Sequence, residues 1–125
     1  MGTSATVVSD VYAAFGRGDI PAVIGALDES VEWTSPATLP QGGHFHGPEG
    51  VVKFFEAVGA AWSDLSLSIE RVSESGDDVA IGVVRADGTL RAGGKSGYGA
   101  THVFTVKSGR ITRFREYTDL DSPLA

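Results

Sequence analysis

Residues 102–119, "HVFTVKSGRITRFREYTD", decide the fold, because they read as two β-strands joined by the short turn "KSG". Successive side chains of a strand point to opposite faces of its sheet. In the second strand, Arg113 and Arg115 therefore fall on one face. Phe114 and Glu116 fall on the other. Since two arginines are costly to bury, their face is predicted to be solvated, and Glu116 is predicted to point into the interior.

The segments before this hairpin predict helices first and further strands afterwards. Apolar residues at helical spacing predict one helix near the N-terminus and two more that begin at Asp19 and at Gly47. A short strand is expected at residues 30–36 and a loop at 37–47, and alternating apolar stretches predict a meander in the second half. This order is typical of a single α+β domain, here residues 1–125, with helices on one face of a curved antiparallel sheet. Such a sheet tends to enclose an apolar pocket for a small molecule.

Composition and charge narrow the possible functions. The chain has 125 residues, of which 42% are hydrophobic, enough for one folded core. The net charge is −6 and the basic residues form no run, which argues against nucleic acid or an anionic membrane as a partner. There is no cysteine, so disulfides and thiolate chemistry are excluded. The first ten residues lack the pattern of a secretory signal and no apolar run is long enough to span a membrane, so a cytoplasmic location is expected.

Three stretches carry a resemblance to a known family: residues 11–36, residues 45–55 ("FHGPEGVVKFF") and residues 102–119. They resemble the nuclear transport factor 2-like superfamily, in its SnoaL-like and ketosteroid isomerase-like branch. The resemblance covers nearly the whole chain and implies a cone-shaped curved sheet with three helices, often assembled as a homodimer through the outer face of the sheet. The same fold hosts isomerases, cyclases, hydrolases and proteins without catalysis.

The functional residues of ketosteroid isomerase have no counterparts here. The positions of its helix tyrosine, its aspartate base and its strand aspartic acid hold Val11, Ser35 and Thr101. None of these can abstract a proton from carbon or serve as a strong donor to an oxyanion, so this particular reaction is not expected.

Limonene epoxide hydrolase, from the same superfamily, is more similar. Its Arg-x-Asp pair and its last-strand carboxylate resemble Arg85, Asp87 and Glu116, whereas its water-positioning tyrosine and asparagine stand here as Trp33 and Ser35. The resemblance implies that Asp87 protonates an epoxide oxygen and that Glu116 activates a water molecule. Arg85 would bridge the two carboxyl groups.

Physical chemistry supports this arrangement of residues and also allows a simpler interpretation. Two carboxylates in a dry cavity tend to share one proton, which gives an acid and a base side by side. The i, i+2 spacing puts Arg85 and Asp87 on one strand face. Alternatively, residues 86–88 ("ADG") form a turn in which Asp87 caps an exposed bend. Arg85 would then form an ordinary ion pair with Glu116 or with an exposed acid.

A larger set of residues is expected to line the pocket around a hydrophobic ligand, although aromatic residues at such spacings also suit a plain core. This set comprises Trp33, Ser35, Phe54, Phe55, Trp62, Tyr98, Thr101 and Phe114.

The histidines are assigned no catalytic role. His44 and His46 are expected in a loop over the mouth of the pocket, and because they lack a third well-spaced ligand, no metal or other cofactor is expected. His102 and Phe104 are expected to serve in core packing or on the outer face, where they support a homodimer interface.

The sequence thus predicts a protein that binds a hydrophobic small molecule and performs acid–base catalysis with carboxylates. Epoxide opening is the most specific form of this hypothesis. A SnoaL-like polyketide cyclase or isomerase is the second enzyme hypothesis. A ligand-binding or dimerisation module without catalysis is the third.

Overall fold

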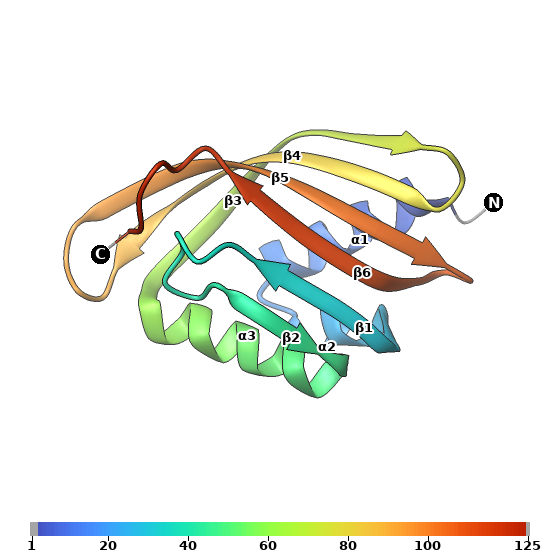
Figure 1. The fold of residues 1–125 in the computed structure, drawn as a ribbon, viewed down its shortest axis with the longest axis horizontal. Helices are drawn as coiled ribbons and strands as arrows, with labels where there is room; N and C mark the ends of the chain where they lie inside the picture. The colour runs from blue at the N-terminus through green and yellow to red at the C-terminus, as the bar shows by residue number, and fades with distance from the viewer. Residues whose placement is uncertain (1–2, 125) are drawn as a thin grey trace.

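The computed structural model describes residues 3–124 and shows an α+β fold in which a curved sheet arches over helices (Figure 1). The helices are α1 (Ser4–Gly16), α2 (Ile20–Gly25) and α3 (Gly47–Ala61). The strands are β1 (Leu27–Ser35), β2 (Gly43–His46), β3 (Trp62–Ser75), β4 (Val79–Leu90), β5 (Lys95–Lys107) and β6 (Arg110–Thr118). The predicted fold class, with its three helices and curved sheet, is confirmed.

The six strands form one sheet in the order β2-β1-β6-β5-β4-β3. All neighbouring pairs are antiparallel except β1 and β6, which run parallel with Trp33 opposite Phe114. The purely antiparallel sheet of the prediction was therefore wrong at this one pair. No hairpin links these two strands, so the long chain between them leaves either direction open. The parallel pair joins the first strand of the chain to the last.

Strand β2 lies inside residues 37–47, which were predicted to be a loop, and this prediction is corrected. β2 pairs antiparallel with β1, with Glu32 opposite His46 and Thr34 opposite His44. Short strands with exposed polar side chains commonly cover the edge of a sheet. The sequence signal for β2 is weak because only Phe45 of its side chains packs against the core.

Local chemistry sets where the helices begin. The Thr3 side chain caps α1 by accepting a hydrogen bond from the Thr6 backbone N–H (3.2 Å), and Asp19 caps α2 in the same way. Helix α3 has a proline within its first two positions and Glu49 in its first turn, both of which suit a helix N-terminus. The helix starts predicted at Asp19 and Gly47 agree with these positions.

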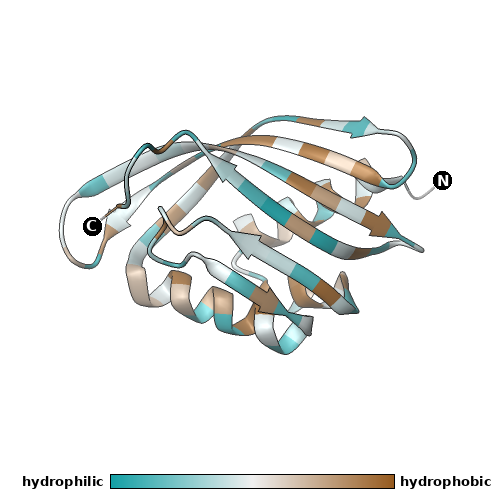
Figure 2. Cartoon of the chain, in the orientation of Figure 1, coloured by the Kyte–Doolittle hydropathy of each residue, from teal (hydrophilic) through white to brown (hydrophobic). Residues whose placement is uncertain are grey.

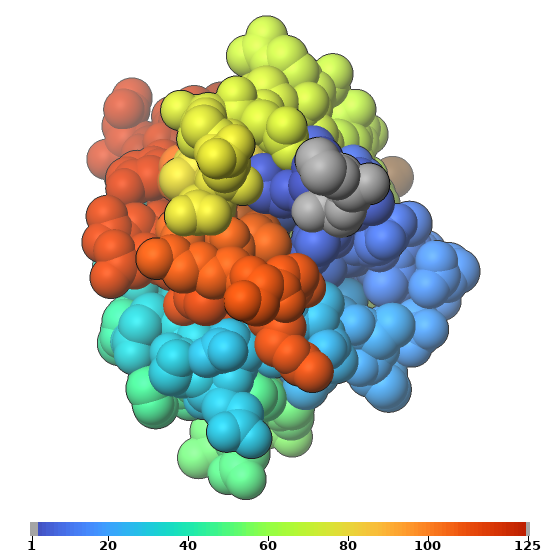
Figure 3. Space-filling view, turned by 90° about the vertical axis from the view of Figure 1, so that its right-hand side faces the viewer, coloured from blue at the N-terminus to red at the C-terminus, as the bar shows by residue number. Residues whose placement is uncertain are grey.

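The inner face of the sheet carries the apolar side chains that the helices cover. Figure 2 shows the alternation of hydrophobic and hydrophilic residues along the strands. On β5, Tyr98, Ala100, His102, Phe104 and Val106 are buried, while the residues between them are partly exposed. Figure 3 shows the end of the molecule near the N-terminus, where the β5–β6 turn (orange) lies between the start of β1 (cyan) and the β3–β4 turn (yellow-green).

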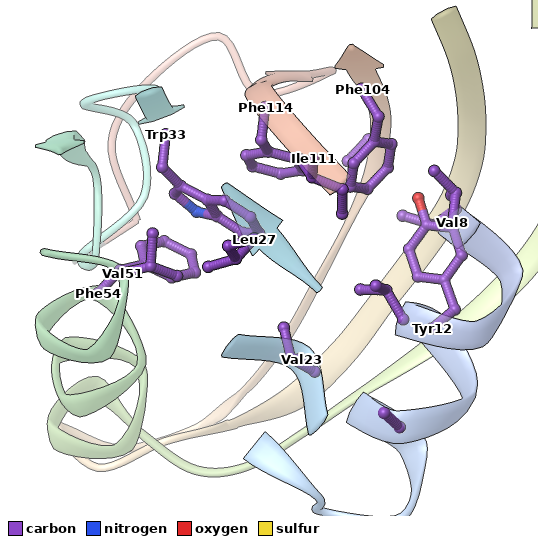
Figure 4. Packing of buried hydrophobic residues seen from close by; sticks show 14 of the residues in the cluster. Val8, Tyr12, Val23, Leu27, Trp33, Val51, Phe54, Phe104, Ile111 and Phe114 are labelled. Atoms are coloured by element: carbon purple, nitrogen blue, oxygen red, sulfur yellow. The ribbon is translucent and has the colours of Figure 1, made fainter. Parts of the chain in front are cut away.

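An aromatic cluster joins β1, β6 and α3 in the core. The Trp33 ring stacks on Phe114 with 4.0 Å between ring centroids, and Phe54 of α3 approaches the other side of this pair at 5.6 Å from Trp33 (Figure 4). On the α1 side, Tyr12 meets Phe104 edge to face at 5.8 Å. These contacts hold helices α1 and α3 against the sheet and border the space between them.

Within residues 3–124, no helix has the length and apolar character needed to cross a membrane.

Candidate functional site

A cavity of about 70 Å³ lies between the inner face of the sheet and the helices α1 and α3. Most of its lining is apolar. The polar side chains with titratable or amide groups in the lining are Tyr12, Gln41, Tyr98, His102 and Glu116. An apolar hollow with a few convergent polar groups is the usual form of a small-molecule site.

Four side chains form a continuous hydrogen-bonded chain across the polar side of this cavity. The Tyr12 hydroxyl lies 2.8 Å from His102 Nδ1, and His102 Nε2 lies 2.9 Å from Glu116 Oε2. The Ser35 hydroxyl donates to Glu116 Oε1 at 2.7 Å. Only 6% of the His102 side chain and 7% of the Glu116 side chain are exposed. We call Tyr12, His102, Glu116 and Ser35 the inner network.

The hydrogen bonds around an ionised Glu116 have one consistent set of donors and acceptors when His102 is neutral. An ionised carboxylate only accepts hydrogen bonds, so it receives one from Ser35 and one from a proton on His102 Nε2. A neutral His102 then has an acceptor at Nδ1, to which the Tyr12 hydroxyl donates. Each hydrogen bond of the inner network then has one donor and one acceptor. The carboxylate is held on two sides and keeps further lone pairs for a ligand.

A glycine on β4, Gly82, makes the inner network possible because it has no side chain. Gly82 lies opposite His102 in the β4–β5 pairing. A Cβ atom placed on Gly82 would lie only 2.1 Å from the Tyr12 hydroxyl oxygen. Any larger residue at this position would therefore push the hydroxyl away from the sheet, and glycine is what lets Tyr12 reach His102.

Both tyrosines near Glu116 remain protonated donors. Burial, followed by the negative charge of Glu116, raises the pKa of Tyr12 well above its ordinary value. The same two causes raise the pKa of Tyr98, and a hydrogen bond with Gln41 opposes them in part. Gln41 is itself fixed, because its Oε1 accepts a hydrogen bond from Trp62 Nε1 at 3.0 Å.

The structure places most of the predicted pocket residues around this cavity. Glu116 lies in the lining, where strand alternation predicts it. The other predicted residues in the lining are Trp33, Phe54, Phe55, Tyr98 and Phe114. Ser35 lies behind Glu116 as its hydrogen-bond donor. Whether these residues bind a substrate remains a prediction.

Arg85 and Asp87 do not join Glu116, and the predicted three-residue arrangement is wrong in its geometry. The side chains of Arg85 and Asp87 are 46% and 59% exposed and lie 3.7 Å apart. On β4 the buried residues are Val84 and Ala86, so the residues that alternate with them face outward. β4 also continues to Leu90, so residues 86–88 form no turn.

Two further residues of the predicted pocket lie elsewhere. Thr101 alternates with the buried Ala100 and His102 and therefore lies on the outer face of β5. Trp62 is buried at the start of β3, where it bonds to Gln41 and does not line the cavity.

His44 and His46 are placed differently from the prediction, whereas His102 follows one of its two predicted alternatives, burial in the core. His102 and Phe104 lie on the inner face of the sheet and cannot form an outer interface. His44 and His46 lie in β2 on the outside, where both contact the carboxylate of Glu32. Among residues 3–124, no group of three or more His, Asp or Glu side chains is arranged to hold a metal ion.

The inner network contains two residues that sequence reasoning missed, Tyr12 and His102. A signal for His102 was present: it shares strand parity with Tyr98, Phe104 and Val106, which marks the buried face. Its pairing with Glu116 was harder to foresee. A register shift lies between Thr105 and Val106, and counting outward from the "KSG" turn without that shift gives the wrong partner.

A curved sheet closed by helices around an apolar cavity is the architecture of the nuclear transport factor 2-like class. The chain belongs to the SnoaL-like domain family, which matches residues 8–114. A similar curated protein is the "Uncharacterized protein Rv0034" of Mycobacterium tuberculosis, which is 30% identical over 112 residues, covering 89% of this chain and 85% of the relative.

Solved structures support the same assignment. An NTF2-like protein of Burkholderia thailandensis superposes with a TM-score of 0.88 at 30% identity, covering 95% of this chain and 92% of that one. An NTF2-like protein of unknown function from Burkholderia pseudomallei superposes with a TM-score of 0.83 at 28% identity, covering 90% of this chain and 88% of that one. Rv0760c of Mycobacterium tuberculosis, in complex with estradiol-17beta-hemisuccinate, superposes with a TM-score of 0.77 at 21% identity, covering 92% of each chain. At this identity the similarity is one of fold alone.

Proposed function

We propose that the protein catalyses proton transfer at carbon in a small apolar molecule, with Glu116 as the base. The observation that carries this proposal is the inner network, in which a buried carboxylate lines an apolar cavity and is held by His102 and Ser35. A base fixed in this way needs little reorganisation when it takes a proton.

The proposed reaction is an isomerisation or a cyclisation of the aldol type. Glu116 removes a proton from a carbon next to a carbonyl group, and the electron pair of the C–H bond moves into an enolate. In an isomerisation, the Glu116 carboxylic acid then returns the proton to another carbon. In a cyclisation, the enolate carbon instead attacks a second carbonyl, whose oxygen takes the proton. Both reactions are balanced without an oxidant or a reductant.

Epoxide opening, the sharpest prediction from the sequence, loses its support. That mechanism needs an acid beside the base, and the predicted acid, Asp87, faces outward with Arg85. In the described lining of the cavity, Glu116 is the only carboxylate. One ionised carboxylate with tyrosine donors nearby suits enolate chemistry better than the protonation of an epoxide.

The test is hydrogen–deuterium exchange at carbon, which reports proton abstraction without knowledge of the natural substrate. A panel of small cyclic ketones, with cyclohex-3-enone as an isomerisation probe, is incubated with the protein in D₂O and followed by NMR. Glu116→Gln should lower the exchange rate by about 10²–10⁴-fold, the usual share of a general base.

Glu116→Gln is expected to fold because the inner network can reverse its protons. The amide introduced at position 116 would donate to His102 Nε2, and the proton on Nδ1 would donate to the Tyr12 oxygen. Glu56→Gln, on the exposed side of α3, is the matched control and should exchange like the wild type. Full exchange in a folded Glu116→Gln protein would exclude Glu116 as the base. Ligand binding without exchange in the wild type would favour a binding module.

We also infer that the protein forms a homodimer through the outer face of the sheet, as its resemblance to the superfamily implies. Tyr117 on this face is 54% exposed, and Val83 and Val103 are only partly covered. Burying such side chains would favour association. Sedimentation should show a dimer at micromolar concentration, and Tyr117→Glu should weaken it. A monomer in the wild type under these conditions contradicts this inference.

A further inference from the structure

The two tryptophans of the chain differ in one respect. The Trp62 indole N–H donates to Gln41 at 3.0 Å. The Trp33 indole nitrogen is equally buried, but it has no hydrogen-bond partner among the described residues. A buried donor without an acceptor costs about 1–3 kcal/mol, so such groups are rare in folded proteins and call for an explanation.

The position of Trp33 connects this donor to the proposed site. Trp33 lines the same cavity as Glu116. It pairs with Phe114 across β1 and β6, and both Ser35 and Glu116 lie two residues farther along their strands. Two residues of a strand span about 7 Å. The residues that carry the unpartnered donor and the proposed base therefore lie on adjacent strands, offset by about 7 Å along the strand direction, and both line the same cavity.

We infer that the ligand of this cavity is a small apolar carbonyl compound whose oxygen accepts the hydrogen bond of the Trp33 indole N–H. The part of this inference that places the neighbouring C–H bond at Glu116 rests on the proposed function. A contact of about 3 Å at each end leaves room for the few bonds between a carbonyl oxygen and its adjacent carbon. A hydrocarbon of the same shape would leave the donor unpartnered, so Trp33 selects for the oxygen.

The cavity also limits the size of this ligand. At about 10–15 Å³ for each water-sized group, a space of about 70 Å³ holds about five to seven such groups. That space suits a molecule with a single ring. The rings of Trp33 and Phe114, which stack face to face, both contribute aromatic carbon to the wall of this cavity, and an apolar ring of the ligand would pack against it.

The first experiment uses the two indole N–H signals of the ¹⁵N-labelled protein. Cyclohexanone is the probe, and methylenecyclohexane, in which CH₂ replaces the oxygen, is its matched control. Cyclohexanone should move the Trp33 N–H proton signal downfield, while the Trp62 signal, already hydrogen-bonded to Gln41, should stay in place. Methylenecyclohexane should produce no downfield shift. The Trp33→Phe variant assigns the two signals and preserves an aromatic ring against Phe114.

The second experiment measures selectivity, because the two probes differ in their solubility in water. The ratio of cyclohexanone affinity to methylenecyclohexane affinity should fall about three- to tenfold in Trp33→Phe, the value of one net hydrogen bond. Tyr117→Phe, on the outer face of the sheet, is the control and should leave the ratio unchanged. An equal loss in Tyr117→Phe, an unchanged ratio in Trp33→Phe, or the absence of any cyclohexanone effect on the Trp33 signal would each overturn the inference.

These outcomes are separable from those of the proposed function. In Glu116→Gln, cyclohexanone should still shift the Trp33 signal although exchange at carbon is lost. If Glu116→Gln keeps its exchange activity, the proposed base is wrong, yet the Trp33 shift tests the carbonyl ligand independently. If the Trp33 shift is absent while exchange depends on Glu116, only the assignment of the oxygen to Trp33 fails.

Discussion

The same two kinds of side chain, histidine and glutamate, meet at two places in this molecule with opposite consequences. Inside the cone, His102 and Glu116 lie 2.9 Å apart and are almost completely buried. Outside, His44 lies 2.6 Å from Glu32, and His46 contacts the same carboxylate, but the histidines are exposed. We call Glu32, His44 and His46 the outer cluster. Its contacts are shorter, yet solvent and salt screen them, so distance alone does not identify a functional site.

The largest expected effect is the loss of the shared acceptor of the inner network. Glu116→Ala leaves the Ser35 hydroxyl and the His102 N–H without a partner inside the core. Each unpaired buried donor should lower the free energy of unfolding by about 1–3 kcal/mol. Glu32→Ala should change it little, because water replaces the lost contacts of the outer cluster. Chemical denaturation of both variants checks the comparison, and an equal loss in both would contradict it.

The next effect comes from the glycine behind Tyr12. Gly82→Ala places a methyl group where the Tyr12 hydroxyl lies, and overpacking of this kind typically destabilises by about 1–3 kcal/mol. Adding Tyr12→Phe should recover part of the loss, since it removes the oxygen that collides. Gly59→Ala, which meets no atom within 4 Å in α3, is the control and should stabilise by about 0.5–1 kcal/mol. No recovery in the double variant would mean that Tyr12 does not fill this space.

A smaller effect should appear in alkaline solution. The pKa of Tyr12 is raised in the folded protein, so the stability that it contributes is complete below its ordinary pKa of 10.0 and is lost as the pH rises above that value. Each such tyrosine contributes a slope of up to about 1.4 kcal/mol per pH unit. In Tyr12→Phe, the unfolding free energy should fall less steeply above pH 10.0, and the fall that remains should be the contribution of Tyr98. An unchanged slope would show that Tyr12 ionises freely.

The smallest expected effect is the change in stability at acid pH when the outer cluster is altered. Hydrogen bonds from His46 and then from His44 lower the pKa of Glu32. A lowered pKa contributes stability above the ordinary pKa of glutamate, and this stability is lost as the pH falls through the lowered value. Glu32→Gln should therefore reduce the acid-side loss of stability slightly, and added salt should reduce the difference further. A difference as large as that of Glu116→Ala would overturn the contrast between the two regions.

Sequence reasoning succeeded where one strand or helix carries its own signal. The parity of Phe114 and Glu116 identified the buried face of β6, the capping residue Asp19 located the start of α2, and the proline and acid of its first turn located the start of α3. It failed where the answer depends on how two strands meet. The parallel pairing of β1 with β6 and the register shift beside Thr105 are set by tertiary packing, and no local pattern encodes them.

The candidate site shows the same division. The outward direction of Arg85 and Asp87 could have been read from their alternation with Val84 and Ala86, but the likeness to an epoxide hydrolase outweighed that signal. The link between Tyr12 and His102 could not be read at all, since it requires a gap at Gly82 on a third element.

The pairing of β1 with β6 has a consequence for how the protein is made. Ser35 and Glu116 are 81 positions apart, so at the usual ribosomal speed of about 5–20 residues per second the first waits about 4–16 s for the second. During that interval the apolar faces of Trp33 and Phe54 have no completed sheet to cover them. Contacts this distant along the chain also slow folding itself. The nascent chain is therefore expected to depend on chaperones until β6 leaves the ribosome.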